Sequence, residues 1–121
     1  MIKVIFDKEK EVFVWKHIDR IYKEDVLSAI EETKKYVGAL DQLKIIELNC
    51  DAEIMFNLVD ISDLPAIISH FDQFGSVKHA FVGNIPKNVA FFTVAIDKLQ
   101  SKRYKAQVFS LKKVAYDWLS E

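Results

Sequence analysis

The sequence predicts an α/β fold: a single mixed, mostly parallel five-stranded sheet with an N-terminal β-hairpin and four helices. Two observations support this prediction. Apolar residues alternate with a period of two over residues 2–15, which is typical of paired strands. After Trp15 the period changes to 3.6, and this change from strand to helix pattern recurs along the chain. Strands that alternate with helices favour right-handed crossovers and therefore parallel pairing.

The composition fits one such domain spanning residues 1–121. Hydrophobic residues make up 50% of the chain and charged residues 29%, a balance typical of globular proteins. The formal net charge is −1, so no overall field attracts nucleic acid or an anionic membrane. No apolar run approaches the roughly 18–20 residues that span a bilayer, and no secretory leader is recognisable. We therefore expect a cytoplasmic protein with no membrane span.

The first three elements follow directly from these periods. Two short strands flank the polar segment 7–10 and form the hairpin; their alternating apolar residues are Ile2, Val4, Phe6, Val12 and Val14. A helix is predicted from about Lys23 to Val37, because its apolar side chains share one face. Its acidic residues come first and its lysines last, the order that the helix dipole favours. Gly38 supplies the stop.

The middle of the chain predicts a strand, a short extended segment and a helix. Residues 43–48 are β-rich and apolar enough for a buried strand, and residues 53–56 are interpreted as extended. Asp60, Ser62 and Asp63 offer caps for the next helix, and Pro65 fits its first turn, where the missing N–H costs nothing. The apolar stripe of this helix consists of Leu64, Ile67, Ile68 and Phe71.

The last third repeats the alternation. Residues 78–83 form a third buried-type strand, a helix runs from Pro86 to about Gln100, and residues 105–109 form the last strand. A final helix is lined by Leu111, Val114, Ala115 and Trp118. No linker, internal repeat or second domain interrupts this order.

Residue types that carry catalysis or hold metals are sparse. Three widely spaced glycines cannot form a phosphate-binding loop. The lone Cys50 excludes a disulfide framework, and we interpret it as a small buried or half-buried thiol. His17, His70 and His79 have no partner three or four residues away; we expect His70 at a helix C-terminus and His79 pointing outward from its strand. The sequence therefore predicts no catalytic residue, no metal and no cofactor.

Two apolar residues exceed what the core needs. On the helix from Pro86 the core face consists of Val89, Phe92, Ile96 and Leu99. Phe91 and Val94 lie roughly 100–160° away from that face. Burial against a neighbouring helix and exposure as a contact surface are both open interpretations. We expect the second, in which Phe91 and Val94 form part of a homodimer contact.

The element order and several motifs resemble the STAS domain, specifically the small SpoIIAA-like bacterial proteins also described as STAS/SEC14-like. The resemblance covers essentially the whole chain. Each motif is weak alone, and their order and spacing carry the resemblance. The motifs are Ile2-Lys3-Val4-Ile5-Phe6, Lys23-Glu24-Asp25-Val26, Leu43-Lys44-Ile45-Ile46-Glu47-Leu48, Val77-Lys78-His79-Ala80-Phe81-Val82-Gly83, Tyr104-Lys105-Ala106-Gln107-Val108-Phe109 and Lys113-Val114-Ala115-Tyr116-Asp117-Trp118-Leu119.

This resemblance implies a non-catalytic regulatory domain that docks a protein partner. In the anti-anti-sigma members of the family, a Ser in an Asp-Ser-Ser-Gly turn is phosphorylated at the start of the second main helix. The matching turn here is Asn57-Leu58-Val59-Asp60, which has neither hydroxyl nor glycine, so the phosphorylation switch does not carry over. The turn itself is still expected to be the docking site. The alternative that the resemblance implies is a small-ligand or lipid-binding domain of the SEC14 type.

Overall fold

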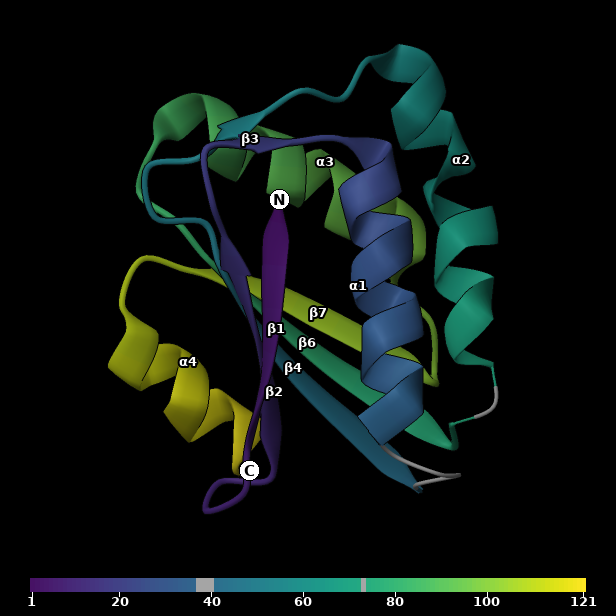
Figure 1. Ribbon diagram of the computed structural model, residues 1–121, viewed down its shortest axis with the longest axis vertical. Helices are drawn as coiled ribbons and strands as arrows, with labels where there is room; N and C mark the ends of the chain where they lie inside the picture. Colours follow the sequence, from purple (N-terminus) through teal and green to yellow (C-terminus); the bar gives the residue numbers. More distant parts are fainter. Residues whose placement is uncertain (37–40, 73) are drawn as a thin grey trace.

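The computed structural model describes residues 1–36, 41–72 and 74–121, and its main feature is a mixed five-stranded sheet (Figure 1). The strand order is β1-β2-β4-β6-β7, in which β1 is antiparallel to β2 and the other neighbours are parallel. The strands are β1 (Ile2–Asp7), β2 (Val12–His17), β3 (Arg20–Ile21), β4 (Gln42–Leu48), β5 (Glu53–Ile54), β6 (Ser76–Val82) and β7 (Tyr104–Phe109). The helices are α1 (Lys23–Tyr36), α2 (Leu58–Ile68), α3 (Pro86–Leu99) and α4 (Lys112–Leu119), with a short 3₁₀ turn at Ser69–Phe71. The α/β class, the mixed sheet and the four helices are confirmed.

The N-terminal hairpin lies at one edge of the sheet, as predicted. Ile2 is opposite His17 and Phe6 is opposite Phe13, so the two strands pair along their whole length. Glu11 closes the turn with a φ of 55°, a left-handed conformation that non-glycine residues adopt rarely. Because β1 has no strand on its outer side, β2 alone connects it to the parallel part of the sheet.

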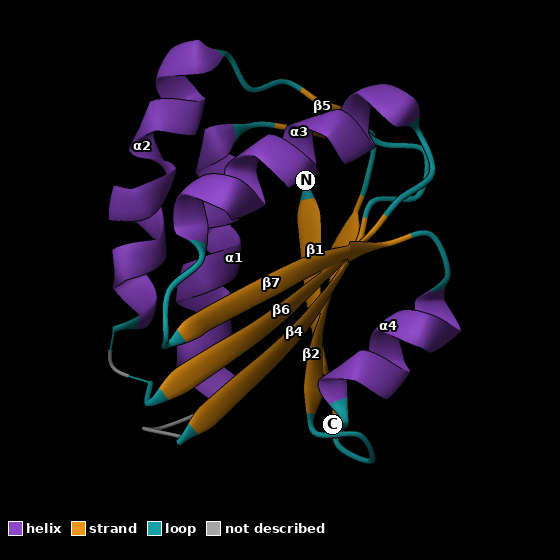
Figure 2. Cartoon of the chain, turned by 180° about the vertical axis from the view of Figure 1, so that it is seen from behind, coloured by secondary structure: helices purple, strands orange, loops and turns teal. Residues whose placement is uncertain are grey.

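A second, two-stranded sheet was not predicted. β3 pairs in parallel with β5, with Arg20 opposite Glu53 and Ile21 opposite Ile54. Only the first half of the segment 53–56 is therefore a strand. This small sheet connects the chain that leaves β2 to the chain that leaves β4, above the carboxyl ends of both strands (Figure 2).

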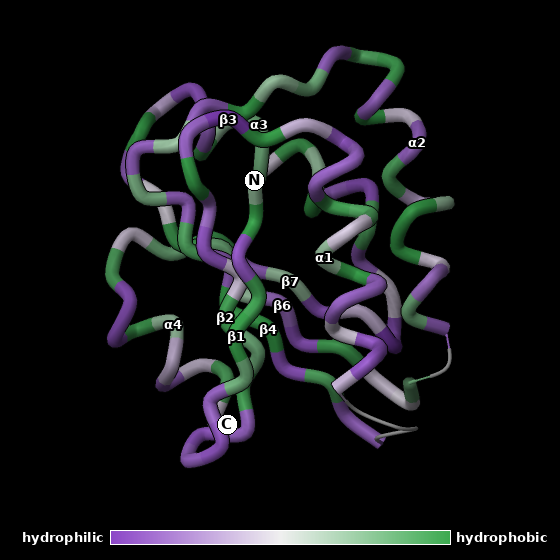
Figure 3. Tube along the Cα trace, viewed as in Figure 1, coloured by the Kyte–Doolittle hydropathy of each residue, from purple (hydrophilic) through white to green (hydrophobic). Residues whose placement is uncertain are grey.

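The helices cover the two faces of the sheet unequally. α1, α2 and α3 pack on one face over the larger apolar core, which includes Phe13, Trp15 and Phe92. α4 alone packs on the other face, over a smaller core around Ile46 and Ala115 (Figure 2). Hydrophobic residues run through the strands where the two cores meet them, and the hairpin turn is hydrophilic (Figure 3).

Helix α2 begins earlier than predicted. Asn57 is its N-cap: the Asn57 side chain accepts from the Asp60 N–H at 2.8 Å, and the Asp60 carboxylate accepts from the Asn57 N–H at 3.0 Å. This reciprocal pair is a capping box, and it places Pro65 in the helix interior instead of the first turn. Ser62 caps nothing, since its hydroxyl donates to the Leu58 carbonyl.

The other helices match the expected positions with smaller differences. α1 is observed to Tyr36, and its predicted end at Val37 and Gly38 lies outside the described residues. The core face of α3 consists of Asn88, Phe92, Ala95 and Leu99. On α4 only Ala115 and Leu119 are buried. Leu111 and Val114 are exposed, so the predicted apolar face of this helix was too wide.

Candidate functional site

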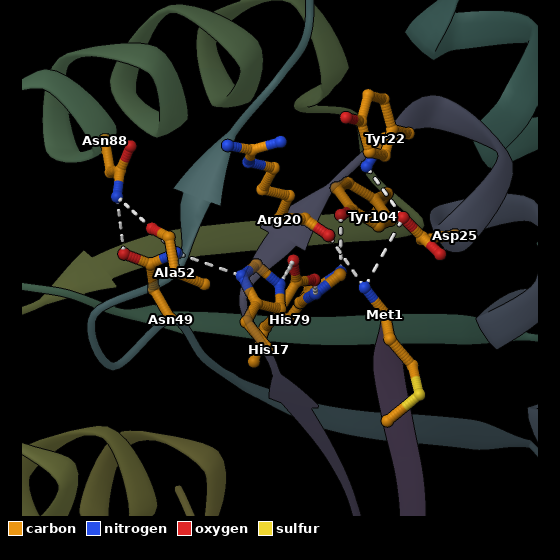
Figure 4. A network of polar contacts seen from close by, with 11 residues as sticks. Met1, His17, Arg20, Tyr22, Asp25, Asn49, Ala52, His79, Asn88 and Tyr104 are labelled. Carbon is orange, nitrogen blue, oxygen red and sulfur yellow. Dashed lines mark hydrogen bonds and ion pairs between the residues drawn. The ribbon is translucent and has the colours of Figure 1, made fainter.

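A cluster of six buried polar side chains lies on the sheet face beneath α1, α2 and α3. Its members come from four strands or strand ends and from one helix (Figure 4). They are His17 at the end of β2, Glu47 on β4, Asn49 just after β4, His79 on β6, Tyr104 on β7 and Asn88 on α3. We call this group the buried polar cluster.

The Glu47 carboxylate is the centre of the cluster. His17 Nε2 lies 2.6 Å from Glu47 Oε2, and His79 Nε2 lies 2.7 Å from Glu47 Oε1. On the outer side of each ring, Asn49 Nδ2 lies 3.0 Å from His17 Nδ1, and the Tyr104 hydroxyl lies 2.8 Å from His79 Nδ1. Both imidazole rings therefore use both of their nitrogens.

The hydrogen positions in this cluster follow from one backbone carbonyl. Asn88 Nδ2 lies 2.8 Å from the Ala52 carbonyl, which can only accept, and 2.7 Å from Asn49 Oδ1. Asn49 must therefore turn its amide nitrogen toward His17 Nδ1, which accepts. The Nε2–H of His17 then donates to Glu47.

His79 is different because its outer partner is a hydroxyl. A hydroxyl can donate or accept, so the hydrogen bond between Tyr104 and His79 Nδ1 persists whether or not that nitrogen is protonated. An added proton on His17 Nδ1 would instead face the Asn49 amide hydrogens. The hydrogen bonds therefore fix the tautomer of His17 and leave that of His79 open.

The contacts keep Glu47 ionised. Burial raises the pKa of its carboxyl, but the favourable electrostatics and the hydrogen bonds of the His17 and His79 rings outweigh burial and lower the pKa from 4.5 to about 2. Burial, followed by repulsion from the Glu47 charge, raises the pKa of Tyr104 well above 10.0. Tyr104 therefore keeps its proton and stays a hydrogen-bond partner of His79.

A narrow cavity lies against the cluster. Its volume is about 40 Å³, and apart from His17, Glu47, His79 and Tyr104 its lining is apolar and aromatic. This space holds about one water molecule and no substrate of ordinary size. Every buried side-chain nitrogen and oxygen in the described part of the chain has a hydrogen-bond partner. The polar atoms of the cluster are therefore satisfied within the chain.

Two histidines and a carboxylate could in other settings hold a metal ion. Here the Nε2 atom of His17 carries its hydrogen, and the donor from Asn49 blocks the tautomer that would free that atom. Over residues 1–36, 41–72 and 74–121, no group of three or more His, Cys, Asp or Glu side chains is arranged to hold a metal ion. The arrangement suits a structural role, in which the cluster connects the strands to α3.

The cluster corrects two predictions about histidines. His79 does not point outward from its strand: it is 2% exposed and stacks on Phe81, with ring centres 4.2 Å apart. His17 and His79 are not isolated either, since both contact Glu47. His70 lies in the 3₁₀ turn that follows α2 and is exposed, close to the expected helix end.

Cys50 is also placed differently from the prediction. It is exposed, not buried or half-buried, and has a φ of 53° in the turn after β4. The turn exists because Asn49 next to it is fixed within the buried polar cluster. In the described residues, the ring nitrogens of His17 and His79 bind Glu47, Asn49 and Tyr104 and not this thiol.

The residues expected at contact surfaces divide into two sets. Leu58 is 82% exposed and Val59 is 68% exposed on the first turn of α2, and Met55 just before them is 37% exposed. We call these three residues the apolar turn. Phe91, in contrast, is half-buried against Phe56, with ring centres 5.2 Å apart. Val94 on the same helix is 50% exposed.

Comparisons with known proteins found no relative of this chain. No protein-family model, no curated protein and no solved structure matches it. None of the helices in the described segments has the length and apolar character needed to cross a bilayer.

Proposed function

We propose that this chain is a non-catalytic regulatory module of the STAS-like type, which acts by binding a protein partner through the apolar turn. The observation that carries the proposal is the exposure of two consecutive large aliphatic side chains, Leu58 and Val59, on a capped helix start. In Figure 3 this stretch is hydrophobic between hydrophilic neighbours. Burial of each side chain by a partner would contribute roughly 1.5–3 kcal/mol before the cost of association.

The backbone of the turn is already ordered, which favours binding. The capping box holds Asn57 and Asp60 in place, and Lys23 Nζ lies 3.8 Å from Asp60 and 3.4 Å from Asp63. A partner that docks here therefore does not have to order the helix start, which lowers the entropic cost of binding. The position also coincides with the turn at which the resembled family docks its partners.

The alternative, a small-ligand or lipid-binding domain, has weaker support. Small-molecule pockets typically measure about 300–1,000 Å³. The cavity beside the buried polar cluster measures about 40 Å³. An acyl chain would have to displace Phe56, Phe91 and their neighbours to enter. A homodimer contact through Phe91 and Val94 is also less favoured, because Phe91 already packs against Phe56.

Affinity capture from cells of the source organism tests the proposal. The bait is compared in three forms: the wild type, the variant Leu58→Ser with Val59→Ser, and the control Leu111→Ser with Val114→Ser. The control removes a second exposed aliphatic pair, which lies at the α4 side of the sheet. We expect one protein to co-purify in stoichiometric amount with the wild type and the control, and not with the α2 variant.

The captured protein is then purified and its affinity for each bait is measured by calorimetry. A loss of at least about tenfold for the α2 variant alone supports the proposal, since about 1.4 kcal/mol of lost apolar burial corresponds to that factor. The absence of any stoichiometric partner, or equal affinity for all three baits, contradicts it.

A further inference from the structure

A second surface, separate from the apolar turn, is a groove beside α4. It has a volume of about 650 Å³ and lies between the hairpin turn, the start of β4 and the length of α4. Figure 2 shows α4 on this face of the sheet with the hairpin turn close to its end. The groove floor is apolar and includes Val12, Tyr116 and Leu119. We call it the lysine groove, after the side chains around it.

Four lysines line the groove from three separate elements. They are Lys10 in the hairpin turn, Lys44 on β4, and Lys112 and Lys113 on α4. Lys10 Nζ lies 3.9 Å from the centre of the Tyr116 ring, and Lys112 Nζ lies 6.0 Å from the same ring. The ring therefore brings two ammonium groups together over the groove.

Acidic groups balance only part of this charge. Asp117 lies 3.4 Å from Lys113, and Asp7 ends β1, where its carboxylate accepts from backbone N–H groups of the hairpin turn. In the described part of the chain, no carboxylate lies within salt-bridge distance of Lys10, Lys44 or Lys112. Among the side chains that line the groove, together with Asp7, four lysines and two aspartates leave an excess of two positive charges.

The strands beneath the groove also bring several positive charges close together. Lys44, Lys78 and Lys105 lie directly opposite one another on β4, β6 and β7. Like charges on neighbouring strands repel one another, so such a row destabilises the sheet unless counter-charge is supplied. Lys78 has its own compensation, because it donates to the Trp118 carbonyl at 2.7 Å and lies over the Trp118 ring. Lys44 has no such acceptor and turns toward the groove.

The start of α4 adds to the positive field. A helix N-terminus carries a partial positive charge, and acidic or capping side chains normally offset it. The N-cap residue Leu111 offers no side-chain hydrogen bond, the first turn has no acidic residue, and it contains Lys112 and Lys113 instead. The lysine ammonium groups and the backbone N–H groups at this end of the helix therefore both favour an anion from outside the chain.

We propose that the lysine groove binds a small soluble anion that carries two or more linked phosphate groups. The volume of the groove lies within the range of small-molecule pockets. Ammonium groups that converge from three elements suit several phosphate oxygens at once, and the excess of two charges favours a multiply charged anion over a single phosphate. The concave shape favours a soluble ligand over the flat surface of a membrane.

Binding of inorganic tripolyphosphate, measured by calorimetry, tests this proposal. The variant Lys10→Gln with Lys112→Gln removes two groove charges, and Lys87→Gln with Lys98→Gln removes two exposed charges from α3 on the opposite face of the sheet. We expect saturable binding to the wild type, with affinity at least about tenfold lower in the groove variant. The α3 variant should bind like the wild type. Thermal unfolding of each variant checks that the fold is intact.

Three results would overturn the proposal. The first is the absence of saturable tripolyphosphate binding, and the second is an equal loss in the two variants, which would indicate only general ionic attraction. The third is binding to phosphatidylcholine vesicles that contain a phosphoinositide, without binding to tripolyphosphate, which would indicate a lipid surface as the ligand. Failure of the groove leaves the apolar turn unaffected, because the two surfaces share no residue.

Discussion

Two substitutions of Glu47 distinguish the contribution of its hydrogen bonds to stability from the contribution of its negative charge. In Glu47→Leu, the inner N–H groups of His17 and His79 lose their acceptor while both rings stay buried. Each hydrogen bond to a charged group is worth about 1.5–3 kcal/mol, so the expected loss is about 3–6 kcal/mol. This is a large share of the roughly 5–15 kcal/mol that stabilises a typical domain.

Glu47→Gln should cost far less because the hydrogens can rearrange. The amide oxygen accepts from His17, which cannot change tautomer, and the amide nitrogen donates to His79 Nε2. The proton of His79 then moves to Nδ1 and donates to the Tyr104 oxygen. The Tyr104 hydrogen turns toward the adjacent cavity, which has room for one water. Only the charge assistance is lost, at about 1–2 kcal/mol.

Urea unfolding at neutral pH measures both free energies, and Glu53→Gln on the exposed edge of β5 is the matched control. Nitrogen NMR of the imidazole rings reports the tautomers. We expect His17 to keep its proton on Nε2 in the wild type and in Glu47→Gln, and His79 to exchange Nε2–H for Nδ1–H. Equal destabilisation by Leu and Gln, or a tautomer change at His17, would refute the reasoning.

Three further outcomes are expected. Because folding lowers the pKa of Glu47 from 4.5 to about 2, the stability that its charge contributes is present above pH 4.5 and is lost as the pH falls toward 2; in acid, the difference in unfolding free energy between the wild type and Glu47→Gln in urea should narrow. Cys50→Gly should raise the unfolding free energy by roughly 0.5–1 kcal/mol in denaturant titrations, because the φ of 53° favours glycine. Phe91→Ser should lower the melting temperature by several degrees through lost packing on Phe56, with about 2–4 kcal/mol lost, whereas exposed Val94→Ser should leave it nearly unchanged.

Elements with a local pattern were predictable from the sequence. The hairpin, α1, α3 and the parallel strands all show the period of their own structure within a short window, and their observed bounds differ from the predicted ones by one or two residues over the described chain. The small sheet of β3 and β5 was missed because each strand has only two residues. The pairing of β3 with β5 depends on where β2 and β4 end, and no periodic arrangement of apolar residues predicts it.

The start of α2 was misplaced for a physical reason. Leu58 and Val59 are large and aliphatic, so they suggest a buried segment, yet both are exposed on the first helical turn. The spacing of Asn57 and Asp60 is itself a capping-box signal. The predicted caps Asp60, Ser62 and Asp63, and the preference of proline for a first helical turn, favoured a later start.

The buried polar cluster could not be predicted from spacing, because its members lie up to 87 positions apart and meet only when the strand order is known. One signal was present in the sequence. Glu47 is a charged residue directly after Ile45 and Ile46, and a central parallel strand is normally apolar on both faces. A carboxylate there needs buried donors, and the chain offers few candidates other than His17 and His79.

Pro65 divides α2 into a front segment before the proline and a rear segment after the break in the hydrogen bonds. Proline has no N–H, so the Ile61 carbonyl lacks the usual hydrogen bond across this point of the helix. Leu64 and Ile67, behind the break, anchor the helix in the core, while Leu58 and Val59 lie ahead of it. Ile61 also lies ahead of the break but packs against the core, so only the exposed first turn of α2 can shift without repacking the interior.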